Sequence, residues 1–326
     1  GVLVAVLGTG VDTSNAQFGR EQVIAGPDYT NATKPTTVDC DGRGTFAAGL
    51  IGARVDRRTT FAGIAPGVRL LAVRYVQATS NGSSDVDPDK LAQAIEAAVR
   101  AHAKVICVVV PSKVDSARLR AAVGVARAAD AVLVAPASEK LGYPAATAGV
   151  LAVGAIDQSG APVSEGSGGY LGIAAPGQGL VGIAPTRTGA VGHIWPIDDP
   201  AYAAAFVAGT AALVRAYRPS LSANQVIARL EHTAGRPAAA GGRDPRLGWG
   251  VVNPYLAVAS EGVDAVPAGP APAVGVAGAR PVVAAKLSGL RLGLAAGMVT
   301  LAVLVAIGTV VVRRGRARGW RSGTAP

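Results

Sequence analysis

Few residues in this chain are of the types that usually act as a nucleophile, a base or a metal ligand. Three histidines, His102, His193 and His232, and two cysteines, Cys40 and Cys107, are present. His102 and His232 fall at the ends of expected helices, where a histidine is solvated or caps the last turn. No grouping of His, Cys and Asp has metal-ligand spacing, and no glycine-rich phosphate loop is present. The sequence therefore predicts no metal site and no cofactor.

Short apolar runs alternate with helical patterns along most of the chain. The runs are GVLVAVLGTG, VRLLAVRYV, KVICVVV, AVLVAPA and GVLAVGAID. Between them, Pro88 to Ala103 places Leu91, Ile95 and Val99 at helical spacing, and SARLRAAVGVARAA predicts a second helix. This alternation predicts an α/β fold, a doubly wound parallel sheet with helices on both faces. Functional groups should then gather at the carboxyl ends of the strands.

The positive charge of the chain is concentrated at its C-terminal end. The formal net charge is +10, but eight basic residues and no acidic ones follow Asp264, which leaves +2 for residues 1–264. A nucleic-acid partner would need a basic face on the folded part. We therefore expect no nucleic-acid binding.

A membrane span is predicted near the C-terminus. From Leu292 to Val312 the chain has 21 residues without a charge, about 30 Å of helix, which matches a bilayer core. The following RRGRARGWR holds five arginines in nine residues. Cationic flanks stay cytoplasmic. We expect a single-pass cell-membrane protein with the large domain outside and the C-terminus in the cytoplasm. A buried core helix is the alternative, but no partner domain follows it.

The expected organisation has four parts. They are a globular ectodomain (1–263), a stalk rich in Pro, Ala and Gly (264–289), a transmembrane helix (290–312) and a basic cytoplasmic tail (313–326). The chain begins directly in an apolar run at Gly1, which suggests a fragment or a processed form.

Five blocks, in order and at compatible spacing, carry a resemblance to a known family. They are GVLVAVLGTGVDTSNAQF, DCDGRGTFAAGLIGA, GIAPGVRLLAVRYV, AYAAAFVAGTAALVRAYRPSLSANQVIARLEHTA and LGWGVVNPYLAV. They resemble the strand, histidine, serine and closing segments of the subtilisin-like serine proteases. The C-terminal span, the Pro-rich stalk and the Cys in DCDG are similar to the mycosins, which are membrane-anchored subtilases of type VII secretion systems. The resemblance implies a subtilisin-like fold over residues 1–258.

The resemblance also implies where a catalytic triad should stand. The acid position falls on Gly8 in LGTG, the histidine on Arg43 in DGRGT, and the serine on Ala201 in DPAYAAA. Glycine has no side chain to orient a base, and a guanidinium offers only donors and stays protonated. A methyl group cannot attack a carbonyl. We therefore expect the chain to lack proteolytic activity.

Three further sites follow from the resemblance. The oxyanion-hole asparagine is replaced by Ser138, a shorter donor. Arg43 could be a cation that binds an anionic or C-terminal peptide group. Alternatively, it could fill space and pair with Asp41 or Asp39, and we favour this second role. His193 precedes the serine segment and could lie near the cleft, but no serine beside it has a helix-entry motif. We expect it to be structural.

Cys40 and Cys107 are the only cysteines in the chain. An even pair in an exported domain predicts a disulfide, although Cys107 does not fall on the partner position usual in the mycosins. Two small buried thiols are the alternative.

The function expected from these observations is that of a pseudoprotease. A catalytically inactive mycosin-like subunit would brace or bind components of a type VII secretion membrane complex. One rival is an active serine endopeptidase with displaced catalytic residues. Another is a peptide-binding module that holds a peptide in the inert cleft.

Overall fold

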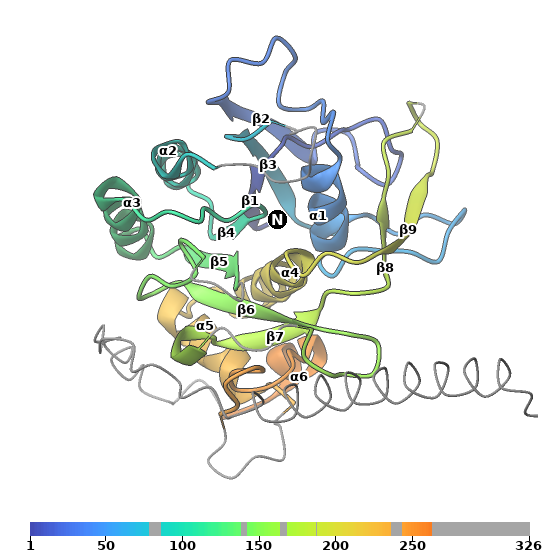
Figure 1. Ribbon diagram of the computed structural model, residues 1–326. Helices are drawn as coiled ribbons and strands as arrows, with labels where there is room; N and C mark the ends of the chain where they lie inside the picture. Colours follow the sequence, from blue (N-terminus) through green and yellow to red (C-terminus); the bar gives the residue numbers. More distant parts are fainter. Residues whose placement is uncertain (78–85, 138–141, 164–167, 187, 236–242, 263–326) are drawn as a thin grey trace, which may run out of the picture. The chain divides into compact units, whose positions relative to one another are not determined.

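The computed structural model describes residues 1–77, 86–137, 142–163, 168–186, 188–235 and 243–262 (Figure 1). The chain divides into two compact units, Gly1–Val274 and Gly275–Pro326, and every described residue belongs to the first. The predicted stalk, transmembrane helix and basic tail lie outside the described residues. Within the described ranges, no helix combines the length and the apolar character needed to cross a bilayer.

A seven-stranded sheet forms the centre of the first unit, in the order β2-β3-β1-β4-β5-β6-β7. Every neighbouring pair runs parallel. The strands are β1 (Leu3–Gly8), β2 (Val23–Asp28), β3 (Arg69–Arg74), β4 (Val105–Val108), β5 (Val132–Pro136), β6 (Leu151–Ile156) and β7 (Ile173–Pro176). The predicted parallel α/β architecture is confirmed. Because all strands point the same way, the loops after β1, β2, β3 and β4 share one edge of the sheet.

Helices cover both faces of this sheet (Figure 1). On one face lie α1 (Arg43–Gly52) and α4 (Tyr202–Tyr217), and on the other lie α2 (Pro88–Arg100) and α3 (Ala117–Ala128). The α1 and α4 helices are rich in Ala and Gly, so their backbones approach their neighbours closely. A Cβ on Gly209 of α4 would lie only 2.8 Å from the Cβ of Ile64.

The second predicted helix, SARLRAAVGVARAA, is α3, whose Ser116 side chain accepts a hydrogen bond from Leu119 N. The first ends at Arg100 rather than at Ala103. His102 has a φ of 59°, in the left-handed region that terminates helices, and its side chain is exposed. The predicted helix-end role of His102 is therefore confirmed.

An antiparallel hairpin was not expected from the sequence. It consists of β8 (Leu180–Ile183) and β9 (His193–Ile197), and it packs against α1, where a Cβ on Gly182 would lie 2.5 Å from the Phe46 ring. The hairpin leads directly into α4. It therefore helps to set the position at which α4 begins.

Two short helices close the unit, α5 (Ala223–His232) and α6 (Pro254–Ala259). Arg229 of α5 is only 1% exposed, and its guanidinium donates to the carbonyls of Ala257, Val258 and Ser260. A buried cation thus satisfies the carbonyls at the C-terminal end of α6. This end lies just before the residue at which the predicted stalk begins.

Candidate functional site

The acid-equivalent position, Gly8, ends β1 beside the first turn of α1. A Cβ on Gly8 would lie 3.8 Å from the Cα of Gly44 and 3.3 Å from the Cβ of Val109. The next residue, Thr9, accepts a hydrogen bond at its Oγ1 from the backbone N–H of Gly44, 3.1 Å away. Val109 therefore partly fills the space in which an acidic side chain would begin.

The histidine-equivalent position, Arg43, is the first residue of α1. Its Nε lies 2.8 Å from Oδ1 of Asp41, and its Nη2 lies 3.3 Å from Oδ2. The pairing favoured for Arg43 is thus confirmed, with Asp41 as the partner. Asp39 has a different task, because its carboxylate accepts hydrogen bonds from Thr45 and from the backbone N–H of Gly42. Both carboxylates accept hydrogen bonds from residues at the start of α1.

The serine-equivalent position, Ala201, is the N-cap of α4. Its methyl group offers no hydrogen-bonding atom, and its backbone N–H donates to Oδ1 of Asp199, 2.9 Å away. The adjacent Tyr202 is buried, and its ring centroid lies 4.4 Å from that of Phe46 in α1. Burial raises the pKa of Tyr202; the charge of nearby Asp199 raises it further, and that of Arg43 opposes the shift. The start of α4 therefore lies next to the start of α1.

Gly8, Arg43 and Ala201, the positions on which the resemblance places the triad, lie at neighbouring ends of β1, α1 and α4. Among these three residues only Arg43 carries a functional group, and that group is ion-paired. Ser138 lies outside the described residues. The preceding Ala137 is described, with its backbone N–H donating to Val153 O at 2.8 Å. The arrangement has no nucleophile and no base at the three triad-equivalent positions.

The predicted disulfide is wrong, because Cys40 and Cys107 are both free thiols. Cys107 lies in the central strand β4 with no exposed surface, and burial raises its pKa to about 12. Cys40 is exposed in the segment before α1. Its Sγ lies 3.7 Å from Nζ of Lys34. The two cysteines thus occupy unlike environments, one inside the sheet and one at the surface.

His193 is a structural residue, as expected. Its Nε2 lies 2.6 Å from Oε1 of Gln17, and its ring stacks edge-on against Phe61 with centroids 5.1 Å apart. Gln17 in turn donates to the carbonyl of Arg54, which lies just after the C-terminal end of α1. Arg43 is at the other end of this ten-residue helix, about 15 Å away. His193 therefore cannot serve as a base at the triad-equivalent site, and His232 is exposed in the last turn of α5.

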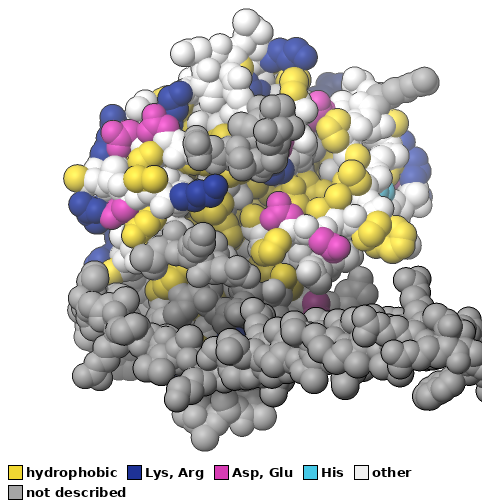
Figure 2. All heavy atoms as spheres, in the orientation of Figure 1, with side chains coloured by type: hydrophobic (Ala, Val, Ile, Leu, Met, Phe, Trp, Pro, Cys, Tyr) yellow, Lys and Arg dark blue, Asp and Glu magenta, His cyan; other side chains and the backbone are white. Residues whose placement is uncertain are grey.

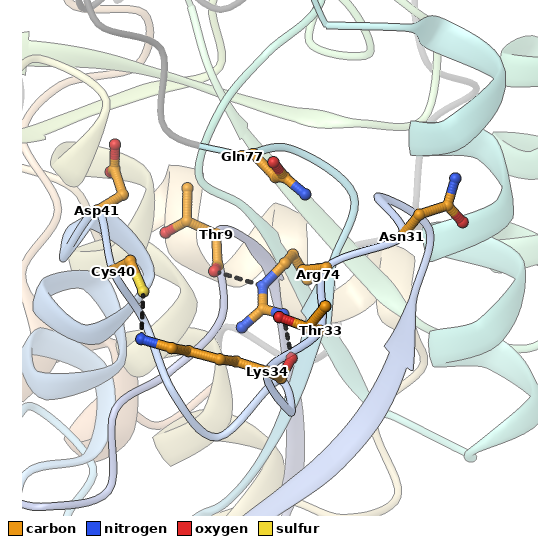
Figure 3. A pocket seen from close by; sticks show the side chains of 9 residues that line it. Thr9, Asn31, Thr33, Lys34, Cys40, Asp41, Arg74 and Gln77 are labelled. Atoms are coloured by element: carbon orange, nitrogen blue, oxygen red, sulfur yellow. Dashed lines mark hydrogen bonds between the residues drawn. The ribbon is translucent and has the colours of Figure 1, made fainter.

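A pocket of ≈ 430 Å³ beside Arg43 was missed by the sequence reasoning (Figure 3). Its lining residues are Thr9, Asn31, Ala32, Thr33, Lys34, Cys40, Asp41, Arg74 and Gln77. Most of them lie in loops that follow β1, β2 and β3. Because β2 was not predicted, the loop over residues 29–42 could not be placed at this edge. The polar composition of that loop was the one feature of the sequence that could have indicated the pocket.

Two features of the described residues concern metal ligands and surface charge. Among the described residues, no cluster of three or more His, Cys, Asp or Glu side chains could hold a metal ion. On the face shown in Figure 2, basic and acidic side chains are interspersed among apolar ones. That face presents no continuous basic surface.

Comparisons with known proteins agree with this geometry. The profile of the Subtilase family matches residues 1–250. Mycosin-4 of Mycobacterium tuberculosis is 34% identical over 308 residues, which cover 81% of this chain and 66% of Mycosin-4. The chain thus spans about two thirds of the length of that relative.

Solved structures of mycosins have the same fold. The crystal structure of MycP1 with the N-terminal propeptide removed has a TM-score of 0.70 and 29% identity, covering 83% of this chain and 93% of that one. A chain of the intact ESX-5 inner membrane complex has a TM-score of 0.68 and 30% identity, covering 96% of this chain and 86% of that one. The chain therefore belongs to the subtilase family and, within it, is of the mycosin type.

Proposed function

We propose that this chain is a non-proteolytic mycosin that serves as a membrane-anchored subunit of a type VII secretion complex. Its subtilase domain (1–263) lies outside the cell membrane, followed by the stalk (264–289), one transmembrane helix (290–312) and a cytoplasmic tail (313–326). The domain braces or binds partner proteins. No cofactor takes part.

The observation that carries the proposal is the set of groups at the triad-equivalent positions. Acyl transfer needs a nucleophile, a base within hydrogen-bond reach of it, and a group that orients the base. Gly8 and Ala201 supply none of these, and the guanidinium of Arg43 is bound to Asp41. In subtilisin, loss of the catalytic serine or histidine alone lowers kcat by about 10⁶. Peptide hydrolysis at a useful rate is therefore not expected here.

Two observations support a place in a secretion complex. A solved relative of similar fold is a chain of the intact ESX-5 inner membrane complex. The 21 uncharged residues from Leu292 to Val312, followed by five arginines, match the requirements of a membrane span with an internal C-terminus. A rigid domain held at the membrane is suited to holding a partner, whether or not it cuts one.

A relocated active site would find no histidine base beside the triad-equivalent positions in the described part of the chain. His193 is bound to Gln17 at the far end of α1 from Arg43, and His102 and His232 lie at exposed helix ends. A peptide-binding role remains compatible with inactivity. The pocket beside Arg43 offers a place where such a peptide could bind.

A fluorophosphonate probe, which labels activated serines, tests the loss of catalysis. We expect no labelling of the purified full chain, because no serine stands at residue 201. A mycosin that keeps Asp, His and Ser at the three positions is the positive control. Labelling of the unaltered chain that disappears on heat denaturation would show a functioning serine and overturn the proposal.

A restored variant provides the matched comparison. Gly8→Asp, Arg43→His and Ala201→Ser return the triad, and Val109→Ala makes room for the new carboxylate, since a Cβ on Gly8 lies 3.3 Å from the Val109 Cβ. We expect the probe to label this variant. The same triple change with Val109 retained should be labelled more slowly, because the acid is crowded out of position.

A further inference from the structure

The pocket beside Arg43 is built from the carboxyl-terminal edge of the sheet (Figure 3). Thr9 follows β1, residues 31–34 follow β2, and Gln77 follows β3. Residues 40–41 come from the segment that enters α1. A volume of ≈ 430 Å³ is within the range of small-ligand sites, and it holds one or two side chains rather than a folded element.

Two of the charged side chains that line the pocket already have counterions. The buried guanidinium of Arg74 lies 2.6 Å from Oδ2 of Asp28, and its Nε donates to Thr9 O at 2.9 Å. The Asp41 carboxylate is engaged by Nε and Nη2 of Arg43. Neither Arg74 nor Asp41 therefore leaves a net charge for a ligand.

Lys34 is the charged lining residue that remains. Its side chain extends across the pocket toward Cys40, as Figure 3 shows, and its Nζ lies 3.7 Å from the sulfur. Among the described residues, no carboxylate lies within ion-pair distance of this ammonium. Its hydrogen-bond partner there is a thiol, which is a weak acceptor. The pocket thus has one uncompensated positive charge.

We propose that this pocket binds the carboxylate of an acidic side chain in a peptide segment of a partner protein. Lys34 is the counterion. Thr33 and Asn31, which line the same pocket, supply neutral polar groups. Because the pocket adjoins the triad-equivalent position, a segment lying there is held next to a site that cannot cut it. This inference goes beyond the proposed function, and its test needs neither a secretion complex nor an activity.

The charge balance favours a carboxylate over a phosphate. A phosphate at neutral pH carries nearly two charges and is usually met by several cations, above all by unpaired arginines. Here both nearby guanidiniums, Arg43 and Arg74, are already paired with carboxylates. One ammonium matches the single charge of an acidic side chain.

Cys40 makes the pocket directly testable, because it lines the pocket and is exposed, whereas Cys107 is enclosed. The full chain is incubated with acetyl-cysteinyl-glycyl-glutamyl amide, presented as its mixed disulfide with 2-aminoethanethiol under mildly reducing conditions. The Cys40 thiolate displaces 2-aminoethanethiol and forms a disulfide with the peptide. The glutaminyl, lysyl and phosphoseryl counterparts compete at equal concentration, and intact mass measures each adduct at equilibrium.

We expect the glutamyl adduct to exceed the glutaminyl one by about two- to fivefold, the range of an exposed ion pair, and the lysyl adduct to be the least abundant. Lys34→Gln should abolish this preference. Lys104→Gln is the matched control, because Lys104 is exposed at the opposite edge of the sheet, before β4. Cys40→Ser should remove all adducts.

Four outcomes overturn the inference. Equal glutamyl and glutaminyl adducts, or no adduct at all, would show that the pocket does not select a carboxylate. A glutamyl preference that survives Lys34→Gln would place its origin elsewhere. A dominant phosphoseryl adduct would assign the pocket to a phosphate instead. None of these results would bear on whether the chain hydrolyses peptides.

Discussion

Arg43 and its ion pair show how far a residue type determines a role. The identity of Arg43 alone excludes a base, because its guanidinium is a permanent donor. The sequence left open whether that cation was available to a ligand. The structure answers this through the 2.8 Å contact with Asp41. Lys34, which drew no attention in the sequence, is the pocket-lining cation for which no carboxylate of the described residues lies within ion-pair distance.

Glu231, in the last turn of α5, provides a test at the scale of one residue. Burial raises its pKa from 4.5 to about 7, an effect that the charge of Arg243 partly offsets. Between these values the folded chain holds a proton that the unfolded chain has lost. The contribution of Glu231 to stability should therefore be most favourable below about pH 4.5 and should fall as the pH rises through 7.

The Glu231→Gln variant removes this titration. At pH 8 we expect the variant to have a larger free energy of unfolding than the parent, by on the order of 1–3 kcal/mol, while at pH 4 the two should be alike. Chemical unfolding of the full chain, followed by tryptophan fluorescence at both pH values, measures the difference. The exposed Glu21→Gln is the control and should show no pH-dependent gain. An equal gain in the free energy of unfolding at pH 4 and pH 8 would show that the gain does not come from the titration of Glu231.

At the scale of elements, the strands that could be predicted from the sequence are those that are buried on both faces of the sheet. Strands β1, β3, β4, β5 and β6 are continuous apolar runs because helices cover the sheet on both faces, and the sequence identified them. The strands it missed are shorter or break the pattern. β2 reads VIAGPD and lies at the edge of the sheet, while β9 reads HIWPI and includes a proline. Without β2, the loop that supplies Lys34 and Cys40 had no place in the fold.

The contact between α5 and α6 gives a prediction about an element. Arg229→Met removes the donors to the α6 carbonyls and leaves them buried without partners. We expect the free energy of unfolding to fall by about 2–4 kcal/mol, and amide hydrogen exchange over residues 254–260 to become faster. Arg218→Met is the matched control, since Arg218 is less buried and one of its bonds reaches Ser260 O at 3.1 Å. Unchanged exchange over α6 in Arg229→Met would refute the capping role.

At the scale of the whole molecule, the proposal predicts co-purification. The full chain should travel with a type VII secretion membrane complex when membranes are solubilised in mild detergent and the complex is isolated through another subunit. A chain ending at residue 289 should be recovered less, because it lacks the predicted anchor. Gly8→Ala, a change at the triad-equivalent positions, should leave recovery unaltered. A full chain that never accompanies the complex would exclude the bracing role.

The family and the convergence of Gly8, Arg43 and Ala201 could be inferred from the sequence because the flanking segments keep their order and spacing. The pocket could not be inferred in the same way. Its lining comes from three loops that are distant in the chain, and their proximity depends on the strand order β2-β3-β1, which no local pattern encodes. The free state of Cys40 and Cys107 likewise required their positions in space.

The crowding of Gly8 by Val109 has a consequence for any substitution at residue 8. The Cβ of Val109 lies 3.3 Å from where a Cβ on residue 8 would be, so the side chains at these two positions are sterically coupled. A single substitution that adds a side chain at residue 8 would therefore meet a steric cost. An acidic side chain introduced at residue 8 is therefore best accommodated when residue 109 is made smaller in the same variant.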